Sequence, residues 1–148
     1  MSKLIVDSNI FINSFNSESE FREESISFLT KLAELGQLIT MPAHGLFEIT
    51  CTLKRLSDIE RNYLHPVIFG EKQYPIEVMH IDNQFIDRYS SVAVPYIKAG
   101  DHLYLVVSKY NGYPLVTRDG GLTKRAIEAG VNVFTPTEYI EQLEKAKA

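Results

Sequence analysis

Short apolar runs alternate along this chain with longer segments in which apolar side chains recur at helical spacing, and this alternation restricts the fold most. The runs have the length and β-branched content of buried strands; they cover residues 4–6, 38–41, 75–81, 114–118 and 131–134. The helical segments cover residues 19–35, 42–56, 59–69, 83–92, 101–110 and 120–129, with a short turn at 10–12 and a terminal helix from 136. Strands separated by helices pair in parallel through right-handed crossovers. We therefore predict an α/β fold around a parallel sheet.

Residues that commonly begin or end helices stand at the ends of these helical segments. Gly36 and Gly130 suit helix C-termini, and Pro42 and Pro136 suit first turns. Asn83 is expected to cap the helix that follows the third strand.

Composition predicts one globular domain, residues 1–148, with 45% hydrophobic and 23% charged residues. One cysteine, Cys51, excludes an intramolecular disulfide framework and is expected in the core. Neither a signal peptide nor an apolar stretch long enough to span a membrane is visible, so we expect a cytoplasmic protein.

Four acids stand where apolar segments start or stop. Asp7 ends the run at 4–6, and Asp119 follows the run at 114–118. Ligands of parallel sheets collect just beyond the carboxyl ends of strands, so these two side chains are expected to face one pocket. Glu48 and Asp101 lie in helical patterns that could bring them there. Such a carboxylate cluster calls for a divalent metal and points to phosphate chemistry.

Each acid also has a plainer explanation. Asp7, Asp101 and Asp119 could each cap a helix or stabilise a turn. Capping does not explain Glu48, which sits among apolar neighbours and is expected at a buried edge, where a carboxylate needs a partner. The four acids together, at matching element boundaries, favour a shared site.

The formal net charge of −4 is unusual for a protein that binds polyanions, whose affinity depends on basic surface. Bound divalent ions would neutralise the acidic cluster. Four cations near Asp101 and Asp119 could add a local basic rim, although a solvated helix face is equally compatible: Lys98, Arg118, Lys124 and Arg125.

The segments 4–12, 100–103 and 115–119, with Glu48 in its helix, resemble the PIN-domain nucleases, most closely the single-domain toxin ribonucleases of the VapC kind. The resemblance spans almost the whole chain. It implies a three-layer α/β/α fold with a central parallel sheet of about five strands. It also implies a Mg²⁺ or Mn²⁺ site made by the four acids, endonuclease action on structured RNA, a cognate antitoxin and a homodimer. The apolar helix around residues 46–56 is a candidate dimer surface.

Within that resemblance, we expect Asp7 and Asp119 to be direct metal ligands, because both leave strand ends. Glu48 and Asp101 would complete the shell or orient the attacking water. Ser8 and Thr117 are expected to steady the carboxylates by hydrogen bonds.

Several other side chains indicate a function only weakly. His102, where many relatives have a small apolar residue, could approach the phosphate but is more often a packing or solvent-facing residue. Four tyrosines could stack RNA bases, although packing is the commoner role: Tyr63, Tyr74, Tyr96 and Tyr110. Three histidines show no ligand spacing and indicate no chemistry: His44, His65 and His80.

Three other functions stay open. A phosphotransferase of the haloacid dehalogenase kind needs an acid two residues after the first aspartate, where this chain has Asn9. A PIN-like module that binds RNA or protein without cutting is the second. An RNA-processing nuclease that is not a toxin is the third.

Overall fold

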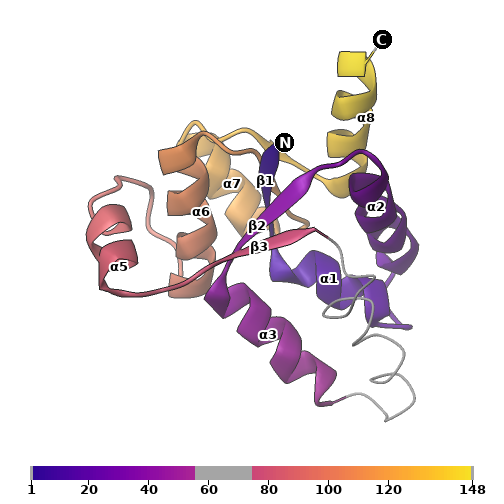
Figure 1. Ribbon diagram of the computed structural model, residues 1–148, viewed down its shortest axis with the longest axis horizontal. Coiled ribbons are helices and arrows are strands. Elements are labelled where there is room, and N and C mark those ends of the chain that lie inside the picture. Colours follow the sequence, from indigo (N-terminus) through magenta and orange to yellow (C-terminus); the bar gives the residue numbers. More distant parts are fainter. Residues whose placement is uncertain (1, 56–74, 148) are drawn as a thin grey trace.

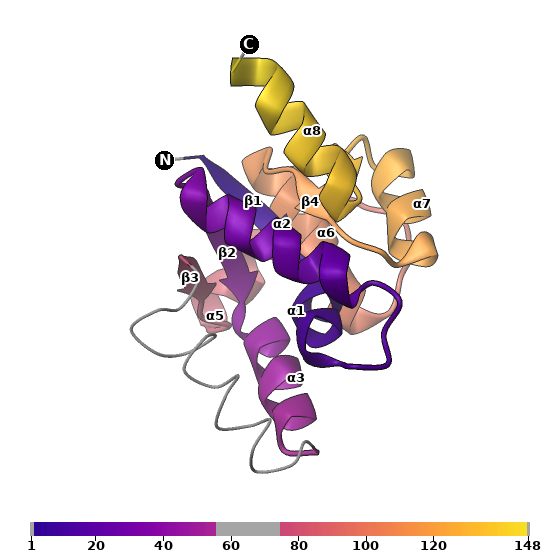
Figure 2. The same cartoon turned by 90° about the vertical axis from the view of Figure 1, so that its right-hand side faces the viewer.

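The computed structural model describes residues 2–55 and 75–147, in which a parallel sheet lies between two layers of helices (Figures 1 and 2). The sheet has the strand order β3-β2-β1-β4-β5, and every neighbouring pair is parallel. Its strands are β1 (Lys3–Val6), β2 (Leu38–Pro42), β3 (Ile76–Met79), β4 (Leu115–Val116) and β5 (Val133–Phe134). The predicted three-layer α/β fold is confirmed.

Seven helices in the described part of the chain cover the two faces of the sheet. Those packed on one face are α1 (Ser8–Phe15), α2 (Arg22–Glu34), α3 (Ala43–Leu53) and α8 (Pro136–Lys147). Those on the other face are α5 (Asn83–Tyr89), α6 (Ala99–Asn111) and α7 (Gly120–Glu128). Within these described residues, no helix is long and apolar enough to cross a membrane.

The central strands divide their side chains between two cores. Leu4 and Val6 of β1 pack with the core under α1, α2, α3 and α8, whereas Ile5 packs with the core under α5, α6 and α7. Strand side chains alternate between faces, so a continuous apolar run serves both cores. Since β1 is buried on both faces, its carboxyl end is held rigidly between the layers.

Several boundaries differ from the sequence prediction. Asp82, not Asn83, caps α5, and its side chain accepts from the N–H of Phe85. That helix ends at Tyr89, and residues 90–98 form no regular element. The helix expected at 59–69 lies outside the described residues. The same is true of four residues of the sequence prediction: Leu56, Tyr63, His65 and Tyr74. Cys51, expected in the core, is only partly buried.

The connections reverse direction beside β1. From β1 the chain proceeds to β2 and β3 on one side, then returns through α5 and α6 to β4 on the other side. Such a reversal leaves a crevice at the carboxyl ends of the two central strands, where ligands of parallel sheets bind. The ends of β1 and β4 therefore define the first place to look for a functional site.

Candidate functional site

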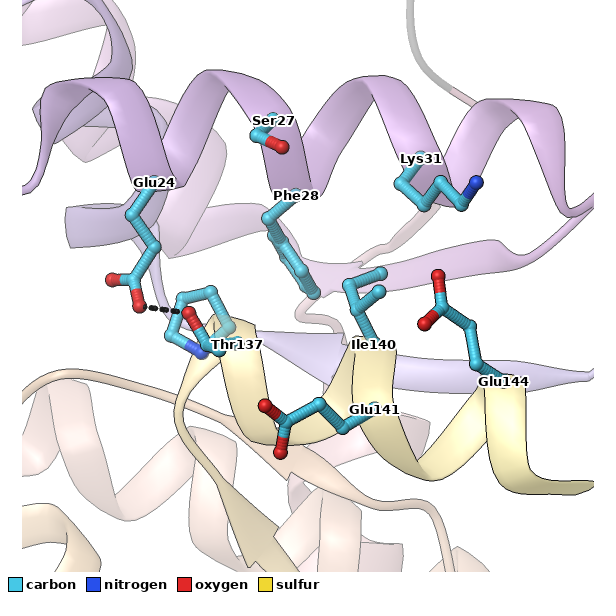
Figure 3. Close-up of a pocket in the computed structure, with 9 residues that line it drawn as sticks. Glu24, Ser27, Phe28, Lys31, Thr137, Ile140, Glu141 and Glu144 are labelled. Carbon is cyan, nitrogen blue, oxygen red and sulfur yellow. Dashed lines mark hydrogen bonds between the residues drawn. The ribbon is translucent and has the colours of Figure 1, made fainter.

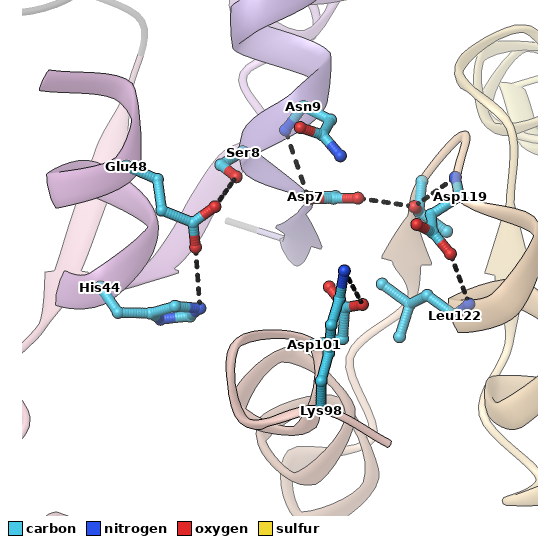
Figure 4. Close-up of polar contacts among 10 residues, drawn as sticks. Asp7, Ser8, Asn9, His44, Glu48, Lys98, Asp101, Asp119 and Leu122 are labelled. Carbon is cyan, nitrogen blue, oxygen red and sulfur yellow. Dashed lines mark hydrogen bonds and ion pairs between the residues drawn. The ribbon is translucent and has the colours of Figure 1, made fainter. Parts of the chain in front are cut away.

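Asp7 lies at the carboxyl end of β1 and is almost fully buried, at 2% exposure. One of its oxygens caps α1, since Oδ1 accepts from the N–H of Asn9 at 3.3 Å. The other, Oδ2, accepts from the hydroxyl of Thr117 at 2.8 Å. Figure 4 shows Asp7 between Asn9 and Asp119. The pKa of Asp7 is raised to about 6, mainly by burial; the two hydrogen bonds oppose the shift, and the charges of Asp101 and Asp119 add to it. Capping thus accounts for only part of the environment of Asp7.

Thr117 joins the ends of β1 and β4. Its buried hydroxyl donates to Asp7 and accepts from the backbone N–H of Asp119 at 3.0 Å. Asp119 itself caps α7, because Oδ1 accepts from the N–H of Leu122 at 2.8 Å. One threonine therefore fixes two acids that lie far apart in the sequence.

Asp101 lies in the first turn of α6, and its side chain lies near Asp7 and Asp119 (Figure 4). The N-cap of α6 is Lys98, so the alternative that Asp101 caps this helix is wrong. The carboxylate is 14% exposed, and Lys98 Nζ lies 3.8 Å from its Oδ2. Burial, followed by the charge of Asp119, raises the pKa of Asp101, whereas Lys98 lowers it. A cation would relieve the cost of ionising such a group.

Glu48 lies on α3 at the edge of the cluster. Its side chain is 47% exposed, so the expectation of a buried edge is wrong; α3 buries Ile49 and turns Phe47 and Glu48 outward. The hydroxyl of Ser8 donates to Glu48 Oε2 at 3.1 Å. The charge of Glu48 also contributes to the raised pKa of Asp101, so the two carboxylates face the same space.

His44 belongs to this neighbourhood, although its sequence position gave it no chemistry. It precedes Glu48 by one helical turn, and its Nε2 lies 3.5 Å from Glu48 Oε1. Its ring packs on Tyr104 with centroids 4.9 Å apart, and burial lowers the pKa of His44, which favours the neutral ring. The four-residue spacing to Glu48 is the signal that could have found it.

Tyr104 of α6 contacts the start of α1 beside the four acids. It is fully buried, and its hydroxyl accepts from the backbone N–H of Ser8 at 3.1 Å. Since Ser8 in turn holds Glu48, Tyr104 connects α6 to both the start of α1 and the acid on α3.

The cations of the expected basic rim behave differently from one another. Arg118 is occupied elsewhere: Nε donates to Glu24 at 2.8 Å, and the guanidinium lies 4.6 Å above the ring of Phe21. Lys98 and Arg125 line the same pocket as Asp101 and Asp119. Lys124 is exposed. The rim is therefore reduced to two cations beside the acids.

The donors suit a hard divalent ion. Within the described residues, no three carboxylate, imidazole or thiol groups converge closely enough to form a complete metal-binding group. Mg²⁺ is commonly held by one or two carboxylates together with water and substrate phosphate, so an open arrangement of oxygen donors fits it. Burial, together with neighbouring acids, raises the pKa of Asp7 and Asp101, and a bound cation would favour the charged form of both carboxylates.

The strand order and the acids define a class: α/β proteins whose carboxylates gather at the crevice between the central parallel strands. The family model described as "PIN domain" matches residues 4–128. The chain belongs to the PIN-domain family. No curated protein matches the sequence.

Solved structures share the fold at low sequence identity. FitAcB from Neisseria gonorrhoeae has a TM-score of 0.61 and 19% identity, covering 90% of this chain and 97% of that one. FitAB bound to the IR36 DNA fragment has a TM-score of 0.64 and 19% identity, covering 90% and 94%. VapBC2 from Rickettsia felis, bound to a DNA fragment from their promoter, has a TM-score of 0.59 and 14% identity, covering 90% and 98%. These likenesses support the PIN fold.

Proposed function

We propose that this protein is a metal-dependent endoribonuclease that hydrolyses phosphodiester bonds in RNA. The observation that carries the proposal is the gathering of Asp7, Asp101 and Asp119 at the carboxyl ends of β1 and β4, with Glu48 at the edge. The family supports nuclease chemistry, since PIN domains are typically nucleases that use divalent metals.

Asp7 and Asp119 are proposed as direct ligands of Mg²⁺ or Mn²⁺, with Asp101 and Glu48 acting directly or through water. The chemistry supplied by the ion is acidification of water and polarisation of the phosphodiester. Thr117 positions Asp7 by donating to Oδ2, and Ser8 positions Glu48 by donating to Oε2. These hydrogen bonds, buried at Asp7 and partly buried at Glu48, would keep the carboxylate oxygens in place before substrate arrives.

The test is cleavage of total RNA by wild type, Asp7→Ala and Asp119→Asn, each with Mg²⁺, Mn²⁺ or chelator. Cleavage should require metal and fall at least about 100-fold in both variants, since losing even an outer-shell partner costs 10–100-fold. Asp87→Asn is the matched control, because Asp87 is an exposed acid on α5. Circular dichroism should show that all variants fold.

Two results would contradict the proposal. Unchanged cleavage by Asp119→Asn would remove Asp119 from the site. No cleavage by wild type under any metal condition would favour the non-catalytic binding module.

We further propose that the protein is the toxin of a toxin–antitoxin pair, rather than an RNA-processing nuclease. The support is the likeness to the FitAcB and VapBC2 folds, together with the earlier resemblance to VapC-type toxins. A cognate antitoxin would then place a segment, often bearing arginine, near the carboxylates. A small neighbouring gene for a DNA-binding protein would favour the toxin role. Homodimerisation is proposed as well, with exposed Phe47 on α3 available to it.

A further inference from the structure

A shallow pocket of about 400 Å³ adjoins the acids on the side of α6 and α7. Asp101 and Asp119 form one part of its lining, and Tyr96, Lys98 and Arg125 form another. Metal binding accounts for the two acids but not for an aromatic ring and two cations. The chemistry of these three side chains is what a nucleotide requires: a flat apolar surface and positive charge for phosphate.

Tyr96 is unusually exposed for an aromatic residue. At 89%, it has the highest exposure among the large hydrophobic side chains of the described residues. It lies in the irregular segment between α5 and α6, directly after Pro95, whose ring restricts the local backbone. The exposed ring of Tyr96 thus lies five residues before Asp101 in the sequence and lines the same pocket.

The two cations are accessible to an anion. Lys98 is 78% exposed, and its contact with Asp101 is loose, at 3.8 Å. Arg125 donates from Nη1 to Glu128 at 3.0 Å, in a pair that is about two-fifths exposed on each side. A solvent-exposed pair such as Arg125–Glu128 contributes little to stability, so a phosphate can replace Glu128 as the partner of Arg125.

Another groove of similar size has the wrong charge for RNA. It lies between α2 and α8, has a volume of about 440 Å³ and contains Phe28 and Ile140 (Figure 3). Its acids are Glu24, Glu141 and Glu144, against the single cation Lys31. Phosphate is repelled there, whereas the pocket beside Tyr96 adjoins Asp101 and Asp119 and carries two cations.

We propose that Tyr96, Lys98 and Arg125 form a subsite for one unpaired nucleotide next to the scissile phosphate of single-stranded RNA. Tyr96 stacks on the base, while Lys98 and Arg125 contact the backbone. This subsite rests on the proposed nuclease function for its choice of ligand. It also explains how a protein with net charge −4 holds RNA, because stacking does not depend on a basic surface.

The test measures binding by fluorescence anisotropy, with Mg²⁺, in the Asp119→Asn background so that the probe stays intact. The probes are fluorescein-labelled oligouridine and a matched oligomer with abasic sites. The parent protein should bind oligouridine about tenfold more tightly than the abasic probe, since only the former offers a base to stack on Tyr96. Tyr96→Leu should abolish this preference, whereas Tyr96→Phe, which keeps an aromatic ring, should retain most of it. Lys98→Gln and Arg125→Gln should weaken binding of both probes equally.

Tyr110→Leu is the matched control, because Tyr110 is a half-exposed tyrosine at the opposite end of α6 from Asp101. A tenfold base preference that survives Tyr96→Leu would overturn the subsite. Unchanged RNA binding with loss of antitoxin binding in Tyr96→Leu would overturn it in favour of a protein contact. Base-dependent binding through Tyr96 without cleavage by wild type would uphold the subsite while the nuclease proposal failed.

Discussion

At the scale of single residues, Asp7 shows how burial and neighbouring acids disfavour the ionised form of a carboxyl group. Its carboxyl is removed from water, receives two hydrogen bonds and lies near the charges of Asp101 and Asp119. The hydrogen bonds favour ionisation, but burial prevails and the pKa is raised to about 6. The folded chain therefore binds a proton at Asp7 more tightly than the unfolded chain does. Stability from this group is complete below pH 3.8 and is lost as the pH rises through about 6.

Asp7→Asn should therefore stabilise the metal-free protein at neutral and alkaline pH. The shift of about two pH units corresponds to about 3 kcal/mol, which is the upper limit of the gain at pH 8. An asparagine keeps the acceptor for the N–H of Asn9, and its amide can donate to Thr117 once that hydroxyl rotates. The measurement is urea unfolding of both proteins in chelator from pH 4 to pH 8. The difference should vanish toward pH 4, where both side chains are neutral.

Excess Mg²⁺ should shrink or reverse this difference, since only the wild type offers a carboxylate to the ion. Asp87→Asn should show no comparable pH-dependent gain. If Asp7→Asn destabilises the protein at pH 8 in chelator, Asp7 does not carry the unfavourable buried charge described above.

At the scale of elements, the site depends on how closely α3 approaches α6. Gly45 of α3 faces the buried ring of Tyr104, and a Cβ at Gly45 would lie 2.5 Å from the tyrosine hydroxyl. That hydroxyl is fixed because it accepts from the N–H of Ser8. The same close approach brings Glu48, one turn along α3, toward Asp101.

Gly45→Ala should lower stability by about 1–3 kcal/mol, because the methyl group must displace the packed ring. The sign is informative, since without a clash alanine in a helix gains up to about 1 kcal/mol over glycine. Gly100→Ala is the matched control: its Cβ would come no closer than 3.7 Å to Glu48 Oε1. Thermal unfolding should rank Gly100→Ala above wild type and Gly45→Ala below it. Adding Tyr104→Phe to Gly45→Ala should recover part of the loss, and no recovery would contradict the proposed clash.

The elements also show how far the sequence could predict the site. The strand end before Asp7 followed from an apolar run and its turn residue, because period and composition are local properties. The strand before Asp119 was predicted too long, since β4 already ends at Val116. The exposure of Glu48 did not follow, since it depends on which face of α3 the rest of the chain covers. The environment of His44 depends on the ring of Tyr104, which comes from a distant helix. The run predicted at 114–118 forms a strand only at β4, where its partner β5 is two residues long.

At the scale of the whole molecule, charge sets the conditions for binding RNA. The chain carries 19 acidic and 15 basic residues, and several cations are already paired within the described residues. Lys3 pairs with Glu77, and Arg118 pairs with Glu24. Next to the carboxylates, Lys98 and Arg125 are the cations that line the pocket. Among the described residues, the two cations of this pocket can therefore neutralise about two phosphates at the same time.

RNA binding should consequently depend only weakly on salt. For single strands, the slope of log affinity against log salt is about −0.7 per neutralised phosphate, so two cations give a slope of about −1.4. Anisotropy titrations of oligouridine against the Asp119→Asn protein, at several KCl concentrations and constant Mg²⁺, measure it. Lys98→Gln should reduce the slope by about half, because one of two counterion-releasing contacts is lost. Tyr96→Leu should lower the affinity at every salt concentration without changing the slope, since stacking releases no counterions. A slope steeper than about −3 would mean that cations beyond this pocket also bind the RNA backbone. The negative net charge of the chain would then not limit its affinity for RNA.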